Sequence, residues 1–492
     1  MVHTSMNPKM GPDAHDAQLP TNGLYSPRRS VVPLGSSFAD DATVIAGSPE
    51  PPSGLMQWPP QSLNRAKSKA RVRADKPIEN SLLIVRQRAA LLEAKQFAHN
   101  LEVLINKLNG PGIRETSTAF EEEFLRIEIT ALPGHYQKQW FTTALEKRNI
   151  PLNRYVNIMA MDSTRVKLID VDPGESDYIN ASYIEGVPTE ISYIAAQSPL
   201  PSTFGHFWQM VWEQGVSVIV MLTKLVEYGK TKGEQYWPDT GSILYGSSYL
   251  VVFESERQKG SALVVRQFYL WKALPGQERD VEMAKTLGRL ITHIQYTKWP
   301  DHGIPKTCKN ILELLAMVDE LIIPDDYALA SADEEAEPYP VLVHCSAGIG
   351  RTGTYISVDV ALRRFYALHN KTALEAEQLK KLGIEPMTVH GLATLVRRLK
   401  QQRFGMVQTW QQYRFAYIAF LYGIRLLLAK EQREIELLEH SQRRQEAKRK
   451  KMSHFGMHSE DDGSGDDMPA SPGTSKLEEM RGKFETMAVK SS

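Results

Sequence analysis

The residues of this chain best suited to chemistry lie within ten consecutive positions, His344 to Gly353, which read HCSAGIGRTG. Cys345 and Arg351 stand six positions apart, with Gly348 and Gly350 between them. Glycines let a backbone curl so that its N–H groups converge on an oxyanion, and a guanidinium binds two phosphate oxygens at once. The same positive field stabilises a cysteine thiolate, the nucleophilic form of that residue. The spacing therefore predicts a loop that binds a phosphoryl group and supplies the atom that attacks it.

The elements on either side of this loop are readable from the pattern of apolar residues. The run Val341–Val343 predicts a buried strand before the loop, and a helical pattern follows from about Gly350 to Leu368. A loop in front of a helix gains the partial positive charge of the helix N-terminus. The alternative, a buried structural cysteine, leaves the surrounding glycines and Arg351 without explanation.

Hydrolysis through a phosphocysteine also needs a carboxylic acid that protonates the leaving group. Asp301 is the candidate, in the segment Trp299–Pro305 after a strand-like stretch, Ile291–Tyr296. Gly303 permits a hinge of the kind a closing loop needs. Asp239 follows the same two letters, Trp-Pro, and three shared letters do not separate the two aspartates. The pair His302-Gly303 after Asp301 favours it over Asp239, which Thr240-Gly241 follows. An ordinary turn is the alternative at either position.

Several motifs in order make the chain similar to the phosphotyrosine-specific, non-receptor protein tyrosine phosphatases, with features that suggest a fungal-type member. The similarity runs from about Phe120 to about Tyr422. It rests, beside the ten-residue loop, on Asn153–Tyr155, Asp177–Ile184, Ala196–Leu200, Glu227 with Tyr236–Pro238, and Gln408–Gln412.

The resemblance implies an α/β protein tyrosine phosphatase fold: a central twisted mixed β-sheet flanked by helices, with the phosphate-binding loop between a strand and a helix. It implies no cofactor and no metal. The implied catalytic residues are Cys345 as nucleophile, Asp301 as acid and then base, Arg351, Gln408 and Thr352. The implied substrate-binding residues are Tyr155, Ser346, Ala347, Gly348, Ile349, Gly350, Arg351 and Gln412, and the supporting residues are His344, Glu227 and Trp299.

The function expected from these residues is hydrolysis of phosphotyrosine in proteins through a phosphocysteine intermediate. One alternative is a phosphotyrosine-binding module of the same fold without activity. A second alternative is a phosphatase for phosphoserine, phosphothreonine or a phosphoinositide, against which Tyr155 argues because it predicts a deep slot. Asn157 stands where many relatives have an aspartate, which leaves the preference for flanking substrate residues open.

Composition divides the 492 residues into five predicted regions. Pro, Ser, Gly and Asp dominate the two ends, which predicts disorder there. The regions are a disordered N-terminal segment 1–77, a helical segment 78–117, the catalytic domain 118–430, a basic helical extension 431–452 and a disordered acidic tail 453–492. Two stretches, Asp325–Pro338 and one within His369–Val389, resemble surface insertions.

Charge and cysteine content bound the partners and the compartment. The formal net charge is zero, which does not favour nucleic acid as a partner. Two cysteines argue against a disulfide framework and for a reducing compartment, and no apolar run reaches the length of a membrane span. We therefore expect a cytoplasmic protein, with the nucleus as an additional location. The expected partners are phosphotyrosine proteins, with MAP kinases as one candidate; the oligomeric state is not predicted.

Two flanking segments have helical patterns of their own. Ser81–Leu108 carries Leu82, Val85, Ala89, Leu92 and Phe97 at helical spacing, and a helix packed on the catalytic domain is favoured over a partner-binding helix. Glu431–Lys451 ends in a basic tract that predicts a nuclear import signal, a patch for an anionic surface, or a solvated helix end.

Overall fold

The computed structural model describes residues 77–114, 116–131, 137–184, 191–273, 275–300, 303–322, 339–369 and 387–456. All of these belong to one compact unit, Pro51–Ser492. The predicted N-terminal region before residue 77, the tail after residue 456 and most of both predicted insertions lie outside the described residues. Asp301 and His302 lie outside them as well.

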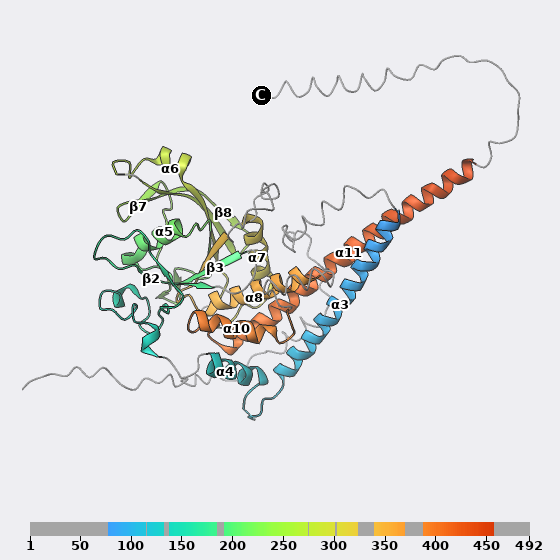
Figure 1. Cartoon of the computed structure of the whole chain (residues 1–492), viewed down its shortest axis with the longest axis horizontal. Helices are drawn as coiled ribbons and strands as arrows, with labels where there is room; N and C mark the ends of the chain where they lie inside the picture. Colours follow the sequence, from blue (N-terminus) through green and yellow to red (C-terminus); the bar gives the residue numbers. More distant parts are fainter. Residues whose placement is uncertain are drawn as a thin grey trace, which may run out of the picture. The chain divides into compact units, whose positions relative to one another are not determined.

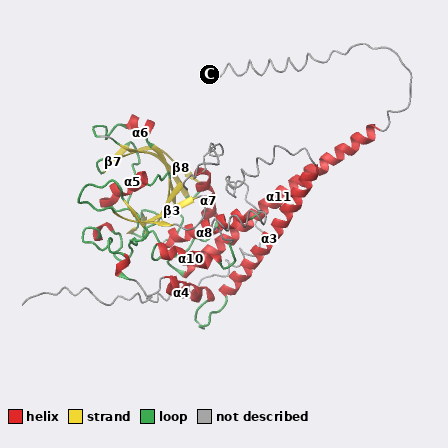
Figure 2. Ribbon diagram, in the orientation of Figure 1, coloured by secondary structure: helices red, strands yellow, loops and turns green. Residues whose placement is uncertain are grey.

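A mixed sheet of nine strands forms the centre of the described structure, in the order β1-β2-β3-β11-β4-β10-β9-β8-β7 (Figures 1 and 2). The strands are β1 Arg165–Lys167, β2 Tyr178–Ile184, β3 Ile191–Ala196, β4 Val218–Met221, β7 Ser242–Tyr245, β8 Tyr249–Lys259, β9 Leu263–Lys272, β10 Arg289–Tyr296 and β11 Tyr339–His344. A separate hairpin pairs β5 Val226–Glu227 with β6 Lys230–Thr231.

Helices cover both faces of this sheet (Figures 1 and 2). On one face lie α7, α8, α10 and α11, and on the other lies α5. Helix α6 packs on β8 and β9, where Ala284 contacts a separate cluster with Leu250, Val252 and Trp271. Their bounds are α3 Pro77–Asn109, α4 Ala119–Ala131, α5 Phe204–Glu213, α6 Val281–Leu287, α7 Lys309–Ile322, α8 Gly350–Leu368, α10 Gly391–Gln402 and α11 Trp410–Gly456; three 3-10 turns are η2 Lys138–Trp140, η3 Ile150–Leu152 and η4 Pro201–Thr203.

Strand β11 shows why the sheet is buried on both sides. Val341 and Val343 pack into the core that includes α7, α8, α10 and α11, while Leu342 packs into the core on the α5 side. Side chains alternate between the two faces of a strand, so a run of apolar residues fits only a strand covered on both faces. The predicted strand Val341–Val343 and the predicted helix Gly350–Leu368 are both confirmed.

Four adjacent strands of the sheet run parallel: β3, β11, β4 and β10. Their carboxyl ends therefore meet along one edge, which is where parallel sheets usually place a ligand. The segments after these ends begin at Gln197, Cys345, Leu222 and Thr297, and they supply most of the candidate site.

The long helices α3 and α11 pack side by side as an antiparallel pair (Figure 1). Glu102 binds Arg425 in an ion pair, Lys95 donates a hydrogen bond to Gln432, and Arg88 binds Glu439. Each step of seven residues down α3 is matched by a step of seven residues up α11. A seven-residue repeat is the signature of a coiled coil.

The predicted helix 81–108 is confirmed as a packed helix, and Phe97 packs against the core, but Val85 and Leu92 do not. Val85 and Leu92 are 63% and 69% exposed, whereas Ile84 and Leu91 are buried against the core. The buried positions continue with Ala94, Ala98, Leu101, Ile105 and Leu108. Steps of three and four residues between them form the seam that faces α11.

Helix α11 is continuous across residue 430, where the sequence placed a domain boundary. Its first half packs into the catalytic core, with Phe420 and Ile424 fully buried, and its last buried core residue is Ile435. The basic extension is thus the distal part of the same 47-residue helix, and that helix runs to Gly456.

Candidate active site

The loop Cys345–Ile349 joins β11 to α8 at the meeting edge of the parallel strands. Gly348 has φ +72°, and a side chain there would lie 2.1 Å from the carbonyl oxygen of Ala196 at the end of β3. Only glycine fits such a position. The amide of Ser198 donates to the carbonyl of Ser346 over 2.9 Å, which fixes the loop to the segment after β3.

Cys345 lies at the centre of this loop and is 5% exposed. Burial alone raises the pKa of its thiol, but the hydroxyl and amide of Thr352, the charge of Arg351 and the amide of Gly348 together lower that pKa below its ordinary value. The Gly348 amide lies 3.3 Å from Sγ. The Thr352 hydroxyl is fully buried, with no other hydrogen-bond partner among the described residues. A lowered pKa favours the nucleophilic thiolate.

Arg351, in the first turn of α8, is held rigidly by the segments after β4 and β10. Its two terminal nitrogens each lie 2.7 Å from an oxygen of Glu227, which is a bidentate ion pair. The guanidinium also donates to the carbonyls of Leu222 and Pro300, at 3.1 and 3.0 Å. Such fixation lowers the entropy lost when the guanidinium binds a phosphate. The β5–β6 hairpin positions Glu227, which is 6% exposed.

The segment that carries the candidate acid is anchored at its start. Trp299 is buried, packs against Phe415, and its indole N–H lies 3.4 Å from the carbonyl of Gly303. The Pro300 carbonyl accepts a hydrogen bond from Arg351, so the residue before Asp301 touches the arginine of the Cys345 loop. Asp301 itself lies outside the described residues.

The competing aspartate, Asp239, follows a segment that packs into the protein. Trp237 is buried against His293 and under the guanidinium of Arg266, and Asp239 itself is exposed. None of the interactions described for this segment joins Asp239 to the Cys345 loop.

Tyr155 lies beside the loop from the opposite side. Its hydroxyl is 2.7 Å from the hydroxyl of Ser346. The segment before it is clamped by Gln197, whose side chain accepts from the Arg154 amide at 2.9 Å and donates to the Leu152 carbonyl at 2.8 Å.

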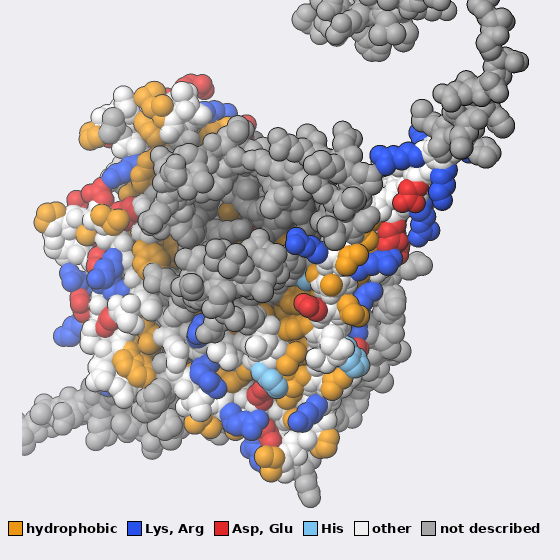
Figure 3. Space-filling model, turned by 45° about the vertical axis from the view of Figure 1, so that its right-hand side comes forward, with side chains coloured by type: hydrophobic (Ala, Val, Ile, Leu, Met, Phe, Trp, Pro, Cys, Tyr) orange, Lys and Arg blue, Asp and Glu red, His pale blue; other side chains and the backbone are white. Residues whose placement is uncertain are grey.

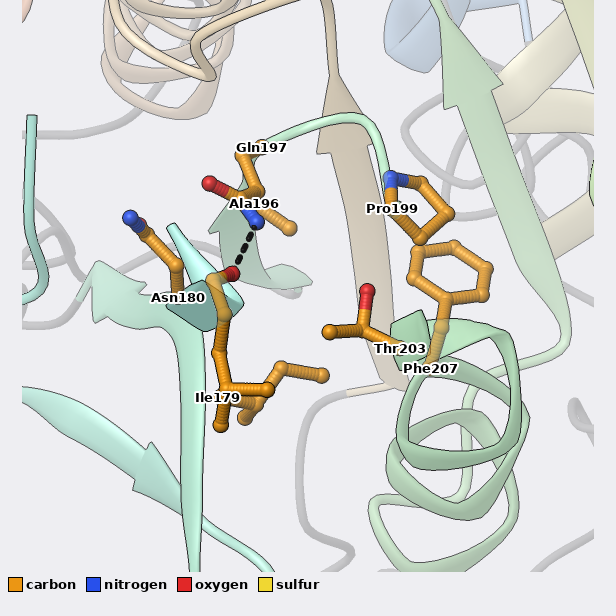
Figure 4. A pocket seen from close by; sticks show the side chains of 8 residues that line it. Ile179, Asn180, Ala196, Gln197, Pro199, Thr203 and Phe207 are labelled. Atoms are coloured by element: carbon orange, nitrogen blue, oxygen red, sulfur yellow. Dashed lines mark hydrogen bonds between the residues drawn. The ribbon is translucent and has the colours of Figure 1, made fainter. Parts of the chain in front are cut away.

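A small pocket lies beside this clamp, between the ends of β2 and β3 and the start of α5 (Figure 4). Asn180 and Gln197 line it on one side, and Thr203 and Phe207 on the other. The dashed line in Figure 4 is the hydrogen bond from the Gln197 amide to the Asn180 carbonyl, 3.1 Å long. Because Gln197 also fixes the Tyr155 segment, we assign this pocket to the packing under the site.

The two predicted glutamines approach the loop from the start of α11. A methyl group built on Gly350 would lie 3.1 Å from Gln408 Oε1 and 3.0 Å from Gln412 Nε2. The Gln412 side chain in turn accepts from the Gln408 amide at 2.8 Å. The structure therefore places both amide side chains against the loop that carries Cys345.

His344 lies behind Cys345, fully buried in a chain of hydrogen bonds. Its Nδ1 lies 3.1 Å from the Cys345 carbonyl, and its Nε2 lies 2.7 Å from the hydroxyl of Tyr236. That hydroxyl is also 3.0 Å from His293 Nε2. Burial lowers the pKa of His344 to about 4, outweighing the Cys345 carbonyl contact, which raises it. A neutral ring that donates through Nδ1 and accepts through Nε2 satisfies all of these contacts.

Sequence reasoning missed a residue that supports the loop from beneath, Arg403. It is fully buried and donates to the carbonyls of Gly348 and Ala347, at 2.8 and 3.1 Å, and to the side chains of Asn180 and Ser182. Burial lowers its pKa to about 10. One signal was available: an arginine five positions before the predicted Gln408, followed directly by Phe404. Nothing local indicated which carbonyls it binds.

The candidate site thus brings together the predicted residues that the structure describes: the loop from His344 to Thr352, Glu227, Trp299, Tyr155, Gln408 and Gln412. Among the described residues, no group of three or more His, Cys, Asp or Glu side chains is placed to hold a metal ion.

Comparison with known proteins agrees with this site. The family model described as protein-tyrosine phosphatase matches residues 149–422, more than half of the chain. The chain therefore belongs to the protein-tyrosine phosphatase family. The match begins after the predicted start near Phe120 and ends at the predicted Tyr422.

Several relatives are similar over the same region. The chain is 38% identical over 301 residues to receptor-type tyrosine-protein phosphatase S of Gallus gallus, covering 61% of this chain and 17% of that protein. It is 36% identical over 286 residues to tyrosine-protein phosphatase 3 of Dictyostelium discoideum, covering 57% and 26%. It is 39% identical over 270 residues to receptor-type tyrosine-protein phosphatase zeta of Rattus norvegicus, covering 54% and 10%. The chain thus spans about a quarter or less of each relative's length.

The expectation of a cytoplasmic or nuclear protein is wrong by this comparison, because most of these similar proteins are receptor-type phosphatases. In the part of the chain that the structure describes, no helix has both the length and the apolar character needed to cross a membrane.

Proposed function

We propose that this chain is an active protein tyrosine phosphatase that hydrolyses phosphotyrosine in proteins through a phosphocysteine intermediate. The observation that carries the proposal is the lowered pKa of Cys345 in a loop of converging amides beside Arg351. A phosphate dianion in that loop lies in line with a sulfur nucleophile. Positioning and charge stabilisation are the main requirements of phosphoryl transfer.

In the first step the Cys345 thiolate attacks phosphorus, and the bond to the tyrosine oxygen breaks. Asp301 donates a proton to that leaving oxygen. Arg351 and the amides of residues 346–350 hold the three other phosphate oxygens, whose charge grows in the transition state. Tyr155 walls the slot against the substrate ring, and its depth favours phosphotyrosine over the shorter phosphoserine and phosphothreonine.

In the second step a water molecule attacks the phosphocysteine, and the S–P bond breaks. Asp301, now a carboxylate, accepts the proton of that water, which Gln408 orients with help from Gln412. The Thr352 hydroxyl stabilises the departing thiolate. His344, Glu227 and Trp299 position these groups without touching the phosphate.

The deciding experiment is hydrolysis of a small aryl phosphate by the full chain in the presence of EDTA. We expect turnover, and we expect Cys345→Ser to abolish it while Cys308→Ser, the matched change at the chain's other cysteine, retains it. Turnover that survives Cys345→Ser would contradict the assigned nucleophile. No turnover by the unaltered chain, with phosphotyrosine peptide still bound, would favour the binding module.

Finer assignments complete the proposal. Faster hydrolysis of phosphotyrosine than of phosphothreonine peptides would support the deep slot. We place the catalytic domain within 118–430, with 78–117 and 431–452 as helical flanks and the segments 1–77 and 453–492 outside it. Classification as a non-receptor, fungal-type member and MAP kinases as partners rest on sequence features alone.

A further inference from the structure

The distal end of α11 carries a concentration of positive charge that the proposed phosphatase reaction does not use. Residues 443–451 include six Lys or Arg and one acidic residue, Glu446. Every residue of this tract is exposed. Figure 3 shows Lys and Arg side chains predominating along the far end of this helix. With about 100° between successive residues, the six cations point in several directions around the helix axis.

The antiparallel register places the start of α3 at the same end of the helix pair. One further heptad beyond the Arg88–Glu439 ion pair places Ser81 level with Glu446, inside the basic tract. Helix α3 begins four residues earlier, at Pro77. The sequence immediately before Pro77, residues 65–76, contains six Lys or Arg and one Asp. In sequence, a second basic tract therefore directly precedes the helix whose start lies beside the basic tract of α11.

This end lies well away from the candidate active site. Helix α11 leaves the region matched by the family model at residue 422, and the basic tract ends at Lys451. At 1.5 Å per residue, that is about 40 Å of helix. The charge therefore has no role in holding a phosphate at Cys345.

We propose that the basic end of the α3–α11 pair, defined by Arg443–Lys451, binds the surface of an anionic lipid bilayer. Clustered Lys and Arg side chains are attracted to acidic headgroups by about 1 kcal/mol each close to the surface. Cations that point in all directions suit a flat, diffuse layer of charge. A nucleic-acid groove instead favours a helix with its basic residues on the face that enters it. The proposal is independent of the phosphatase activity.

The test is co-sedimentation of the full chain with vesicles of phosphatidylcholine alone or mixed with phosphatidylserine. We expect binding only to the mixed vesicles, falling as salt is raised, because the attraction is screened. Replacing Lys448, Arg449, Lys450 and Lys451 by Gln should weaken binding at least about tenfold. The matched control replaces four exposed cations of the catalytic domain by Gln, namely Lys147, Lys167, Arg257 and Arg279, and should bind as the unaltered chain does. Aryl phosphate hydrolysis should be unchanged in both variants, which shows that both are folded.

Three results would overturn the proposal. The first is equal binding of the unaltered chain to both kinds of vesicle, or an equal loss of vesicle binding in both four-residue variants. The second is tighter binding to duplex DNA than to the mixed vesicles at the same ionic strength. The third is a chain that does not bind vesicles and in which Lys448, Lys450 and Lys451 are protected from amine labelling. Deletion of residues 459–467 would then remove this protection. That segment carries five acidic residues and would then be the occupant of the basic end.

Discussion

The ammonium group of Lys400 lies 3.0 Å from the carbonyl oxygen of Val407, the residue immediately before Gln408. Val407 has φ +55°, a conformation that a β-branched residue rarely adopts. Its own amide donates to the carbonyl of Ile349, so both sides of this strained residue are tied down. Lys400 is buried beside the ring of Phe124, and its second partner is Glu128. We infer that Lys400 holds Gln408 in place through Val407.

Lys400→Met keeps the length of the side chain and removes the charge that holds Val407. We expect kcat to fall about tenfold, because Gln408, which we propose orients the attacking water, is misplaced while the first step proceeds. Stopped-flow measurement with an aryl phosphate should then show a larger burst of phenol before slow turnover. Glu128→Gln, which leaves the Val407 contact intact, is the control. A loss of kcat without a burst would mean that Lys400 acts on the first step or on folding.

The choice between the two Trp-Pro-Asp segments is open to a direct comparison. Asp301→Ala should lower kcat by about 10²- to 10⁴-fold, since the leaving oxygen loses its proton donor. Asp239→Ala removes an exposed carboxylate beyond the buried Trp237 and should leave kcat nearly unchanged. The dependence of kcat on pH separates the two roles further. The ionisation that belongs to Asp301 should disappear from this profile in Asp301→Ala and remain in Asp239→Ala. Equal losses in two folded variants would show that the acid was assigned wrongly.

Gly233 and Ser198 share one space beneath the site. A methyl group on Gly233 would lie 2.4 Å from Ser198 Oγ and 3.3 Å from Ser198 Cβ. Gly233→Ala should therefore lower the free energy of unfolding by about 1–3 kcal/mol through overpacking. Adding Ser198→Ala removes the clashing hydroxyl and should recover much of that loss.

Denaturant unfolding of the two single variants and the double variant measures this coupling. Ser198→Ala alone serves as the control, since its hydroxyl has no hydrogen-bond partner among the described residues. Strictly additive effects would show that the two side chains do not compete for this space.

Stability should depend on pH through His344, whose pKa is lowered from 6.5 to about 4 by burial. Between these two values the unfolded chain binds a proton at this position and the folded chain does not. The free energy of unfolding therefore falls as pH is lowered from 6.5 towards 4, by at most about 1.4 kcal/mol per unit. Buried His293, whose pKa is also lowered by burial, acts in the same direction.

His344→Gln should flatten the dependence of the unfolding free energy on pH in that window, whatever it does to stability at pH 7. His440→Gln, at an exposed position of α11, is the matched control. An unchanged slope in His344→Gln would show that the proton uptake belongs to other groups.

Local sequence was sufficient to predict the strand, loop and helix around Cys345, because the spacing of glycine and arginine and the runs of apolar residues are local signals. It was insufficient for α3, where Ile84 and Val85 begin two equally periodic stripes. Only the partner helix decides which stripe is buried. Arg403 was missed for a similar reason: its acceptors, the carbonyls of Ala347 and Gly348, lie some 55 positions away in sequence. The ion pair of Glu227 with Arg351 was accessible only through the family resemblance.

Helix α11 begins two residues after Gln408 and continues without interruption for 47 residues. A helix of that length is a stiff rod about 70 Å long. It is joined at its start to the Gln408 segment and is packed along its middle against α3. A twist or pull applied near Gly456 would be transmitted along this helix, past its contacts with α3 and the core, to Trp410. A rigid helical protein fused to that end would allow a mechanical force to be applied to α11, and the turnover rate could then be measured under load.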